Sequence, residues 1–226
     1  MKSNETLRVA RDLLGEKVAH VLRTQIIAGE IPVGTRLIED DLAARMGTSR
    51  GPLRDALALL SVEGLVSTSP GRGTYVKGLT EASANELMAV RSILEEYAAR
   101  LATARIRPEG ESALRDLVDQ MVQAARLRDL DSFVGLDLRI HRMIWNLSGN
   151  ERLVDVLNYL IPPCSVLVRL NAETYTDWSA MVELHQTLAD AIVSGDADEA
   201  ARSMRVHIEA ARREAMNALR SRSTDG

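Results

Sequence analysis

The sequence predicts a mainly α-helical protein, with an N-terminal winged helix-turn-helix followed by an antiparallel bundle of six helices. Residues 39–76 contain two short helical patterns separated by a tight turn, and two β-rich runs follow them. From residue 81 onward the pattern is helical and carries no strand signal. Aromatic residues make up only 3% of the chain, which favours helices over sheets. The predicted domains are residues 1–78 and 79–221, followed by a tail at 222–226.

Residues 7–28 are predicted to form the first helix, because their apolar side chains recur at a helical period. Gly29 ends this pattern, and residues 31–34 read as a turn. We expect this helix to pack under the two short helices as the third helix of the domain.

The two short helices are separated by Gly47-Thr48-Ser49, and Thr48 or Ser49 is a suitable N-cap for the second helix. When the apolar residues of the second helix face inward, Arg50 and Arg54 share its outward face. In a helix-turn-helix the second helix enters the major groove with its N-terminal residues leading. Arg50 and Arg54 are therefore candidates for base or phosphate contact, and Ser49 and Thr48 for phosphate contact.

Residues 65–68 and 74–77 predict a β-hairpin, the wing, and the Ser-Pro-Gly-Arg-Gly segment between them places Arg72 at its tip. Arg72 suits the minor groove or the phosphate backbone, and Gly71, Thr74 and Arg36 complete the candidate DNA-contacting set. A solvated surface charge is the alternative for each arginine. Residues 1–78 hold 11 Lys and Arg against 9 Asp and Glu, whereas the rest of the chain is acidic, as expected if the N-terminal domain contacts DNA.

Six helices are predicted in the second domain, and Arg107-Pro108, Ser148-Gly149-Asn150 and Ser194-Gly195-Asp196 are among the breaks between them. Their ranges are 81–105, 108–128, 130–148, 150–172, 177–194 and 196–221. Thr80 is the expected cap of the first, with Ser83 as the rival cap. Pro162-Pro163 should kink or split the fourth.

One aspartate and three of the four histidines fall where the helical period asks for an apolar residue: Asp137, His141, His185 and His207. Burying such groups costs about 1–3 kcal/mol each unless they find partners. A core histidine bonded to a carbonyl explains any single one. Together they weaken that explanation and leave a divalent metal site as the alternative, because one metal ion would satisfy all four groups and facing helices of a bundle commonly build such sites. Zinc is the first choice, and nickel, manganese, iron and copper are alternatives that affinity order does not separate.

Arg91 lies on an apolar stripe, so its guanidinium is predicted to point into the bundle. A buried guanidinium needs an anion. Glu95 or another internal acid is one such partner, and the carboxylate of a bound effector is the other.

Five motifs follow one another along residues 34–76: Gly34-Thr35-Arg36-Leu37, Asp41-Leu42-Ala43, Ser49-Arg50-Gly51-Pro52-Leu53-Arg54-Asp55-Ala56-Leu57, Glu63-Gly64-Leu65-Val66 and Gly71-Arg72-Gly73-Thr74-Tyr75-Val76. With these motifs in this order, residues 34–76 resemble the DNA-binding domain of the GntR family of bacterial transcription regulators. The resemblance departs from the commonest pattern at Gly51, where Thr is usual, and at Asp40, where some relatives carry Arg.

Residues 81–215 are similar to the ligand-sensing FCD domain of the FadR-type branch of that family. The matching pieces include Val90-Arg91-Ser92-Ile93-Leu94-Glu95, Asp137-x-x-x-His141, Leu147-Ser148-Gly149-Asn150, Glu183-Leu184-His185 and Met204-Arg205-Val206-His207. The resemblance implies that Asp137 and the three histidines hold a divalent metal, and that Arg91 holds the carboxylate of an effector. The direct passage from wing to helix implies the six-helix, VanR-like variant.

The expected function is a metabolite-responsive transcription regulator, a repressor rather than an enzyme, that binds a near-palindromic DNA operator as a homodimer and responds to a small organic acid. A regulator sensing the metal itself and a metal-dependent hydrolase are the alternatives. The inward stripes offer the hydrolase no obvious general base. The single cysteine, Cys164, excludes an intramolecular disulfide and suits a reducing cytosol. The sequence shows neither a signal peptide nor an uncharged membrane-spanning run, which predicts a cytoplasmic protein without a membrane partner.

Overall fold

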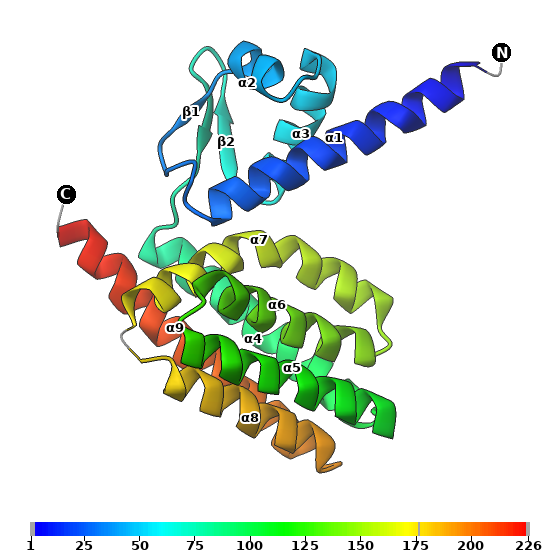
Figure 1. Ribbon diagram of the computed structural model, residues 1–226, viewed down its shortest axis with the longest axis vertical. Coiled ribbons are helices and arrows are strands. Elements are labelled where there is room, and N and C mark those ends of the chain that lie inside the picture. The colour runs from blue at the N-terminus through cyan, green and yellow to red at the C-terminus, as the bar shows by residue number, and fades with distance from the viewer. Residues whose placement is uncertain (1–2, 176, 225–226) are drawn as a thin grey trace. The chain divides into compact units, whose positions relative to one another are not determined.

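The computed structural model describes the backbone of residues 3–175 and 177–224 and the side chains of residues 14–175 and 177–221. The chain folds as two compact units, Met1–Leu79 and Thr80–Gly226 (Figure 1). The division falls one residue after the predicted boundary between the domains. The first unit mixes helices with a small sheet, and the second is helical.

The N-terminal unit is assembled on a long helix, α1 (Ser3–Ile27), which packs against α3 (Arg50–Val62). Val18, Ala19, Leu22 and Ile26 of α1 are buried. Leu14 and Val21, which the periodicity places on the same apolar face, are instead exposed, so the buried stripe is narrower than predicted. Helix α2 (Glu39–Arg45) packs against α3 and completes the helix-turn-helix.

A three-stranded antiparallel sheet forms the wing, with the strands in the order β1-β3-β2. The hairpin strands are β2 (Val66–Ser69) and β3 (Gly73–Val76), with Val66 opposite Val76 and Ser69 opposite Gly73. Strand β1 (Arg36–Leu37) adds to the other edge of β3, so that Arg36 is the partner of Tyr75. This strand is not predicted from the sequence, and it fixes Arg36 beside the wing.

The second unit contains the six predicted helices, with each end within three residues of its predicted position. They are α4 (Glu81–Thr103), α5 (Pro108–Leu127), α6 (Leu130–Leu147), α7 (Glu151–Thr174), α8 (Ser179–Val193) and α9 (Ala197–Thr224). Thr80 and Ser83, the rival caps, act together in a capping box, because each side chain bonds the backbone N–H of the other. Helix α9 continues through Thr224, into the predicted tail, and the last two residues lie outside the described part of the chain.

Helix α7 continues through Pro162 and Pro163, where a split was possible. The two prolines remove the N–H donors for the carbonyls of Asn158 and Tyr159, and these residues are exposed, so water is available to their carbonyls. Among the described helices, α7 also has the length and hydropathy of a membrane-spanning segment, but half of that stretch is buried inside the bundle. A mostly apolar core helix gives the same pattern.

Helix α4 contacts α6, α7, α8 and α9, and therefore contributes to the centre of the bundle. Its inward face carries two fully buried charged residues, Arg91 and Glu95, among apolar neighbours. Helices α6, α8 and α9 bring further polar side chains to the same region, and these define the candidate site.

Candidate metal centre and DNA-binding surface

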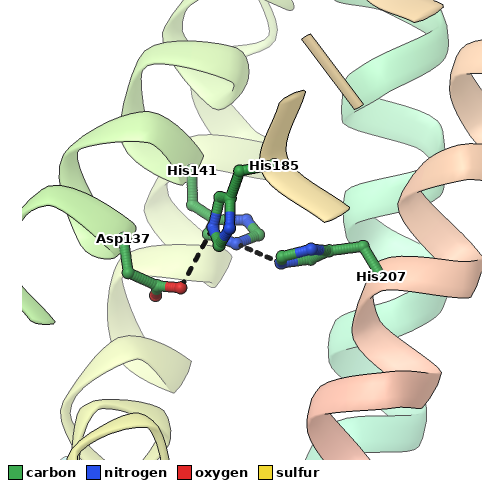
Figure 2. Close-up of side chains that lie close together, drawn as sticks. All are labelled: Asp137, His141, His185 and His207. Carbon is green, nitrogen blue, oxygen red and sulfur yellow. Dashed lines mark hydrogen bonds and ion pairs between the residues drawn. The ribbon is translucent and has the colours of Figure 1, made fainter. Parts of the chain in front are cut away.

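Four side chains from three helices converge in the helical unit (Figure 2). Helix α6 supplies Asp137 and His141 from successive turns, α8 supplies His185, and α9 supplies His207. One potential ligand atom from each residue lies within 4.8 Å of the others, and all four side chains are buried. The structure thus brings together the four residues that the sequence singles out as a metal-binding set.

Two close contacts join the four residues in pairs. His185 Nε2 lies 3.1 Å from Asp137 Oδ1, and His141 Nε2 lies 3.0 Å from His207 Nε2. Asp137 therefore pairs with a histidine from another helix rather than with His141, its neighbour one turn along α6. The contact between two imidazole nitrogens brings two potential ligand atoms close together, as a shared cation requires.

Hydrogen bonds outside the cluster orient two of the imidazole rings. His185 Nδ1 lies 2.7 Å from the Met181 carbonyl oxygen, which can only accept, so Nδ1 carries the hydrogen. His141 Nδ1 lies 2.5 Å from Glu95 Oε2, and it donates to this carboxylate. Both Nε2 atoms are then left with a lone pair toward the cluster, which is the arrangement that outer hydrogen bonds give to metal-binding histidines.

The charge states of Asp137 and His207 also match those of metal ligands. Burial alone would raise the pKa of Asp137, but its close contact with His185 and the neighbouring charges, including that of Arg91, outweigh burial and lower the pKa to about 2. Burial, and then the neighbouring His185, His141 and Arg91, lower the pKa of His207 well below its ordinary value. At neutral pH the carboxylate is ionised and this imidazole is neutral, and metal binding requires both conditions.

Arg91 has an internal partner, as one of its two predicted alternatives requires. Its Nε donates to Glu95 Oε1, and the other carboxylate oxygen of Glu95 accepts from His141 and, at 2.9 Å, from the Trp145 indole. Burial alone would raise the pKa of Glu95, but Arg91 and His141 lower it to about 2. Arg91 Nη2 remains buried without a partner. The Nε donor of the guanidinium is therefore satisfied, and its Nη2 donor is not.

A cavity of about 140 Å³ borders this cluster, and its lining includes Val168, Met181 and Leu184 beside the polar groups. In the described part of the chain, six buried side-chain nitrogen or oxygen atoms lack a hydrogen-bond partner, and five of them belong to residues lining this cavity. These five are Arg91 Nη2, Asp137 Oδ2, Asn171 Oδ1, His185 Nε2 and His207 Nδ1. Buried polar atoms are nearly always paired in proteins, so this concentration marks a place where a bound ion or ligand completes the pairing.

Asn171 is a site residue that the sequence interpretation did not select. It lies on α7 one turn after Leu167 and Val168, both buried, and its own side chain is buried. A polar residue on a buried stripe is the same signal that indicates the histidines, but no sequence motif includes Asn171.

The two candidate arginines of the helix-turn-helix lie exposed on α3 and form ion pairs with α2. Arg50 Nε lies 2.5 Å from Asp40 Oδ1, and Arg54 Nε lies 2.7 Å from Glu39 Oε2. Both arginine side chains are more than 60% exposed, so solvent screens these pairs and each contributes little stability. The guanidinium groups therefore remain available to an external anion.

The two residues before α3 occupy different environments. Ser49 is the N-cap residue of α3, but its side chain makes no capping hydrogen bond and the residue is exposed. Thr48 is half-buried, and its hydroxyl oxygen is buried without a partner.

The wing places Arg72 at an exposed tip between two glycines in left-handed conformations, Gly71 (φ 74°) and Gly73 (φ 100°). The side chain of Arg36 lies against this turn: its Nε is 3.2 Å from the position that a Cβ would occupy at Gly73. Thr74 differs from the other candidates. It is only 8% exposed and its hydroxyl lies 3.0 Å from that of Thr68, so its side chain is buried and already has a hydrogen-bond partner within the sheet.

Comparison with known proteins assigns both units. Residues 14–76 match the family described as bacterial regulatory proteins, gntR family, and residues 86–210 match the FCD domain. The chain belongs to the GntR family. The gluconate operon transcriptional repressor of Bacillus licheniformis is 30% identical over 84% of this GntR-family chain and 80% of its own length. The repressor of the same name from Bacillus subtilis is 31% identical over 80% of this chain and 76% of its own length.

Solved structures show the same fold. The structure of E. coli McbR/YncC has a TM-score of 0.77 and 22% identity, covering 87% of this chain and 94% of that one. The metal-free FCD domain of TM0439 has a TM-score of 0.54 and 18% identity, covering 64% of this chain and 99% of that domain. The predicted family and fold class are confirmed. GntR regulators bind DNA operators, and their FCD domains bind small-molecule effectors, so the protein is a transcription regulator and not a hydrolase.

Proposed function

We propose that this GntR regulator is a cytoplasmic repressor whose FCD domain binds a divalent metal ion and a small carboxylate effector that changes its affinity for an operator. The proposal rests on the five unpartnered polar atoms that surround one cavity beside four converging ligand groups. The names of the two gluconate operon repressors support repression as the mode of action.

Asp137, His141, His185 and His207 would hold the metal through one oxygen and three nitrogens. Zinc is well suited to this donor set, and nickel, manganese and iron are the alternatives. A bound divalent ion would supply positive charge to a site that already contains an ionised Asp137 and would give an anionic ligand a second point of attachment. Asp137 Oδ2 and His185 Nε2 would then gain the partner that they lack.

Arg91 would bind the carboxylate of the effector. Its Nε is held by Glu95, which fixes the guanidinium plane, while Nη2 is buried and unpaired in a residue that lines the cavity. A carboxylate on that side would satisfy the remaining donor, and charge-assisted pairs of this kind are stronger than neutral hydrogen bonds.

The winged unit would bind one half of an operator, with Arg50 and Arg54 at the major groove and Arg72 at the wing tip. One such unit reads only one half-site, so a homodimer on a near-palindromic operator is the matching assembly. Ser49 and Thr48 at the start of α3, and Gly71, Thr74 and Arg36 in the wing, complete the proposed interface, with Thr74 able to contribute only through its backbone.

Arg91→Met tests the effector role, because it removes the guanidinium and keeps an apolar side chain of similar length. An operator sequence would be selected in vitro with the zinc-loaded protein, and fluorescence anisotropy would report its binding. In the wild-type protein, some member of a panel of small mono- and dicarboxylates should weaken operator binding. Arg91→Met should lose that response. Zinc content, circular dichroism and operator binding without acid would verify that this variant, in which Glu95 has lost its arginine partner, is folded and loaded.

Arg100→Met is the matched control, since Arg100 is an exposed arginine of the same helix that pairs with Asp198. Its response to the acid should equal that of the wild type. An unchanged acid response in Arg91→Met would contradict the assignment of Arg91. A change in operator affinity on adding or removing zinc, with no acid having any effect, would show a metal sensor instead.

A further inference from the structure

The residues that line the cavity beside the proposed metal centre carry three kinds of unpaired polar atom, and each kind requires a different partner. Asp137 Oδ2 and His185 Nε2 belong to the proposed metal set. Arg91 Nη2 is a donor, and His207 Nδ1 also carries a hydrogen when Nε2 is a metal ligand, so both suit a carboxylate. Asn171 Oδ1 is the remaining atom. It is an acceptor, so a carboxylate cannot pair with it, and it is not one of the four proposed metal ligands.

The orientation of the Asn171 amide follows from its other hydrogen bond. Its side-chain nitrogen donates to the carbonyl oxygen of Ala211 at 3.1 Å, and a carbonyl oxygen can only accept. The amide nitrogen must therefore lie on that side, and the amide oxygen is an acceptor without a partner. Asn171 is 2% exposed, so bulk water does not satisfy this oxygen.

We infer that Asn171 selects the effector, and that the ligand is a small hydroxycarboxylic acid whose hydroxyl donates to Asn171 Oδ1. This inference rests on the proposed function, in which Arg91 and the metal hold the carboxylate. A plain carboxylic acid would satisfy Arg91 and leave the amide oxygen of Asn171 buried and unpaired. A hydroxyl group beside the carboxylate satisfies both.

Charge favours a hydroxyl over an ammonium group as the donor. Arg91 and Glu95 compensate each other, so the net positive charge of the site comes from the divalent ion. A hydroxy acid with one carboxylate lowers that charge. An amino acid is zwitterionic, so it would leave the charge in place and bring an ammonium group close to the metal, at an electrostatic cost in a buried site.

The size of the cavity limits the length of the acid. Apolar cavities of roughly 150 Å³ accommodate benzene, which has six non-hydrogen atoms, so a cavity of about 140 Å³ takes a molecule of roughly six to eight. Hydroxy acids of three to five carbons are in this range. The matched series of butyrate, 2-hydroxybutyrate and 2-aminobutyrate therefore fits the cavity and varies only the donor.

Isothermal titration calorimetry of the zinc-loaded full-length protein with this series tests the inference. The wild type should bind one enantiomer of 2-hydroxybutyrate about 10-fold or more tightly than butyrate, because an unpaired buried acceptor is costly. Asn171→Leu, which keeps the volume and removes the acceptor, should bind the two acids equally. Val168→Ala, one turn earlier in the same cavity wall, should shift the affinities for both acids alike. Zinc content and circular dichroism would verify that each variant is folded and loaded.

Each other outcome of this experiment has a distinct meaning. Equal affinities of the wild type for butyrate and 2-hydroxybutyrate overturn the role of Asn171 and leave the proposed function standing. Tighter binding of 2-aminobutyrate overturns the choice of hydroxyl. A preference for the hydroxy acid that persists in Asn171→Leu assigns the selection elsewhere and overturns the inference. If none of the three acids binds, the inference fails, and the operator-binding assay with the panel of mono- and dicarboxylates decides whether the carboxylate effector fails with it.

Discussion

Glu95 connects three buried polar side chains of the FCD domain. Its carboxylate accepts hydrogen bonds from Arg91, His141 and Trp145, and it is fully buried. It neutralises the arginine proposed to hold the effector, and it orients an imidazole proposed to hold the metal. A change at Glu95 should therefore affect both proposed binding events, although Glu95 itself is not a proposed ligand of either.

Glu95→Gln should weaken zinc binding by about 10- to 100-fold, the usual effect of removing a hydrogen-bond partner of a metal-binding histidine. It should also destabilise the fold by about 3–5 kcal/mol, because Arg91 is left as an uncompensated buried charge. Competition with a chromophoric zinc chelator measures the first effect, and urea unfolding measures the second.

The control for this substitution is Glu96→Gln, at the next position of α4. Glu96 is partly exposed and bonds Ser92 and Arg205 away from the site. Equal zinc affinities in the two variants would show that Glu95 does not orient His141.

Helical periodicity predicted the four metal-centre residues and Arg91, because a polar residue on a buried stripe is visible in one helix alone. It could not predict which side chains meet across helices. Glu95 and His141 are separated by 46 positions, and their contact depends on how α4 and α6 pack. The pairing of Asp137 with His185, rather than with its helical neighbour, is of the same kind.

At the scale of the element, the arginines on the exposed face of α3 are paired with acidic residues of α2. Asp40 and Glu39, in the first turn of α2, hold Arg50 and Arg54 of α3. If Arg50 and Arg54 contact DNA as proposed, phosphates would replace these acids, and the acids would reduce attraction to any DNA and orient the two arginines before contact. The departure from the family pattern at Asp40 would then serve that orientation.

Arg50→Ala and Arg54→Ala should each weaken operator binding by about 1–3 kcal/mol if the arginine reads a base, with relaxed sequence preference at one position of each half-site. An arginine that contacts only phosphate should instead weaken binding to all sequences and reduce its salt dependence. Anisotropy titrations at several salt concentrations, on operator and scrambled DNA, distinguish the two roles.

Arg45→Ala, in the last turn of α2, provides the control because it removes the same charge from an exposed residue of the neighbouring helix. Its operator affinity should change little. If all three variants lose affinity equally and for every sequence, the recognition role of α3 is contradicted.

The sequence predicted the long elements better than the short ones. The six helices of the second unit each have several turns of periodicity and clear breaks, so their type and order could be predicted. Strand β1 has two residues, too few for any period, and it exists because β3 offers a free edge. Thr74 was chosen from a motif, and only the pairing of β2 with β3 shows that its side chain is interior.

At the scale of the whole molecule, the proposed metal centre cross-links three helices that are distant in sequence. Its four residues come from α6, α8 and α9, all within the unit Thr80–Gly226. The winged unit contributes none of them. Metal binding should therefore stabilise one unit directly and leave the intrinsic stability of the other unchanged.

Removing zinc with a chelator should lower the midpoint of thermal unfolding of the helical unit by about 5–10 °C. This shift is expected when the free zinc concentration before removal is about 100 times the Kd of the site. Hydrogen exchange should speed up in α6, α8 and α9 and stay unchanged in α1 to α3. His207→Asn should reproduce the effect, and His20→Asn, at an exposed position of α1, should not. Equal acceleration of exchange in both units would contradict a metal centre confined to the second.

The hydrogen bond from Trp145 to Glu95 also gives the protein a fluorophore inside its sensing site. The indole lies 2.9 Å from the same carboxylate oxygen that orients His141, and the two rings are 6.4 Å apart between centroids. The second tryptophan, Trp178, stacks on Phe133 and donates to the Ala172 carbonyl, so its surroundings are different. A metal ion bound at His141 or a carboxylate bound at Arg91, as proposed, would change the charge next to Glu95 and so the electronic states of Trp145. The emission spectrum of the unlabelled protein is therefore expected to follow occupancy of the proposed site in real time.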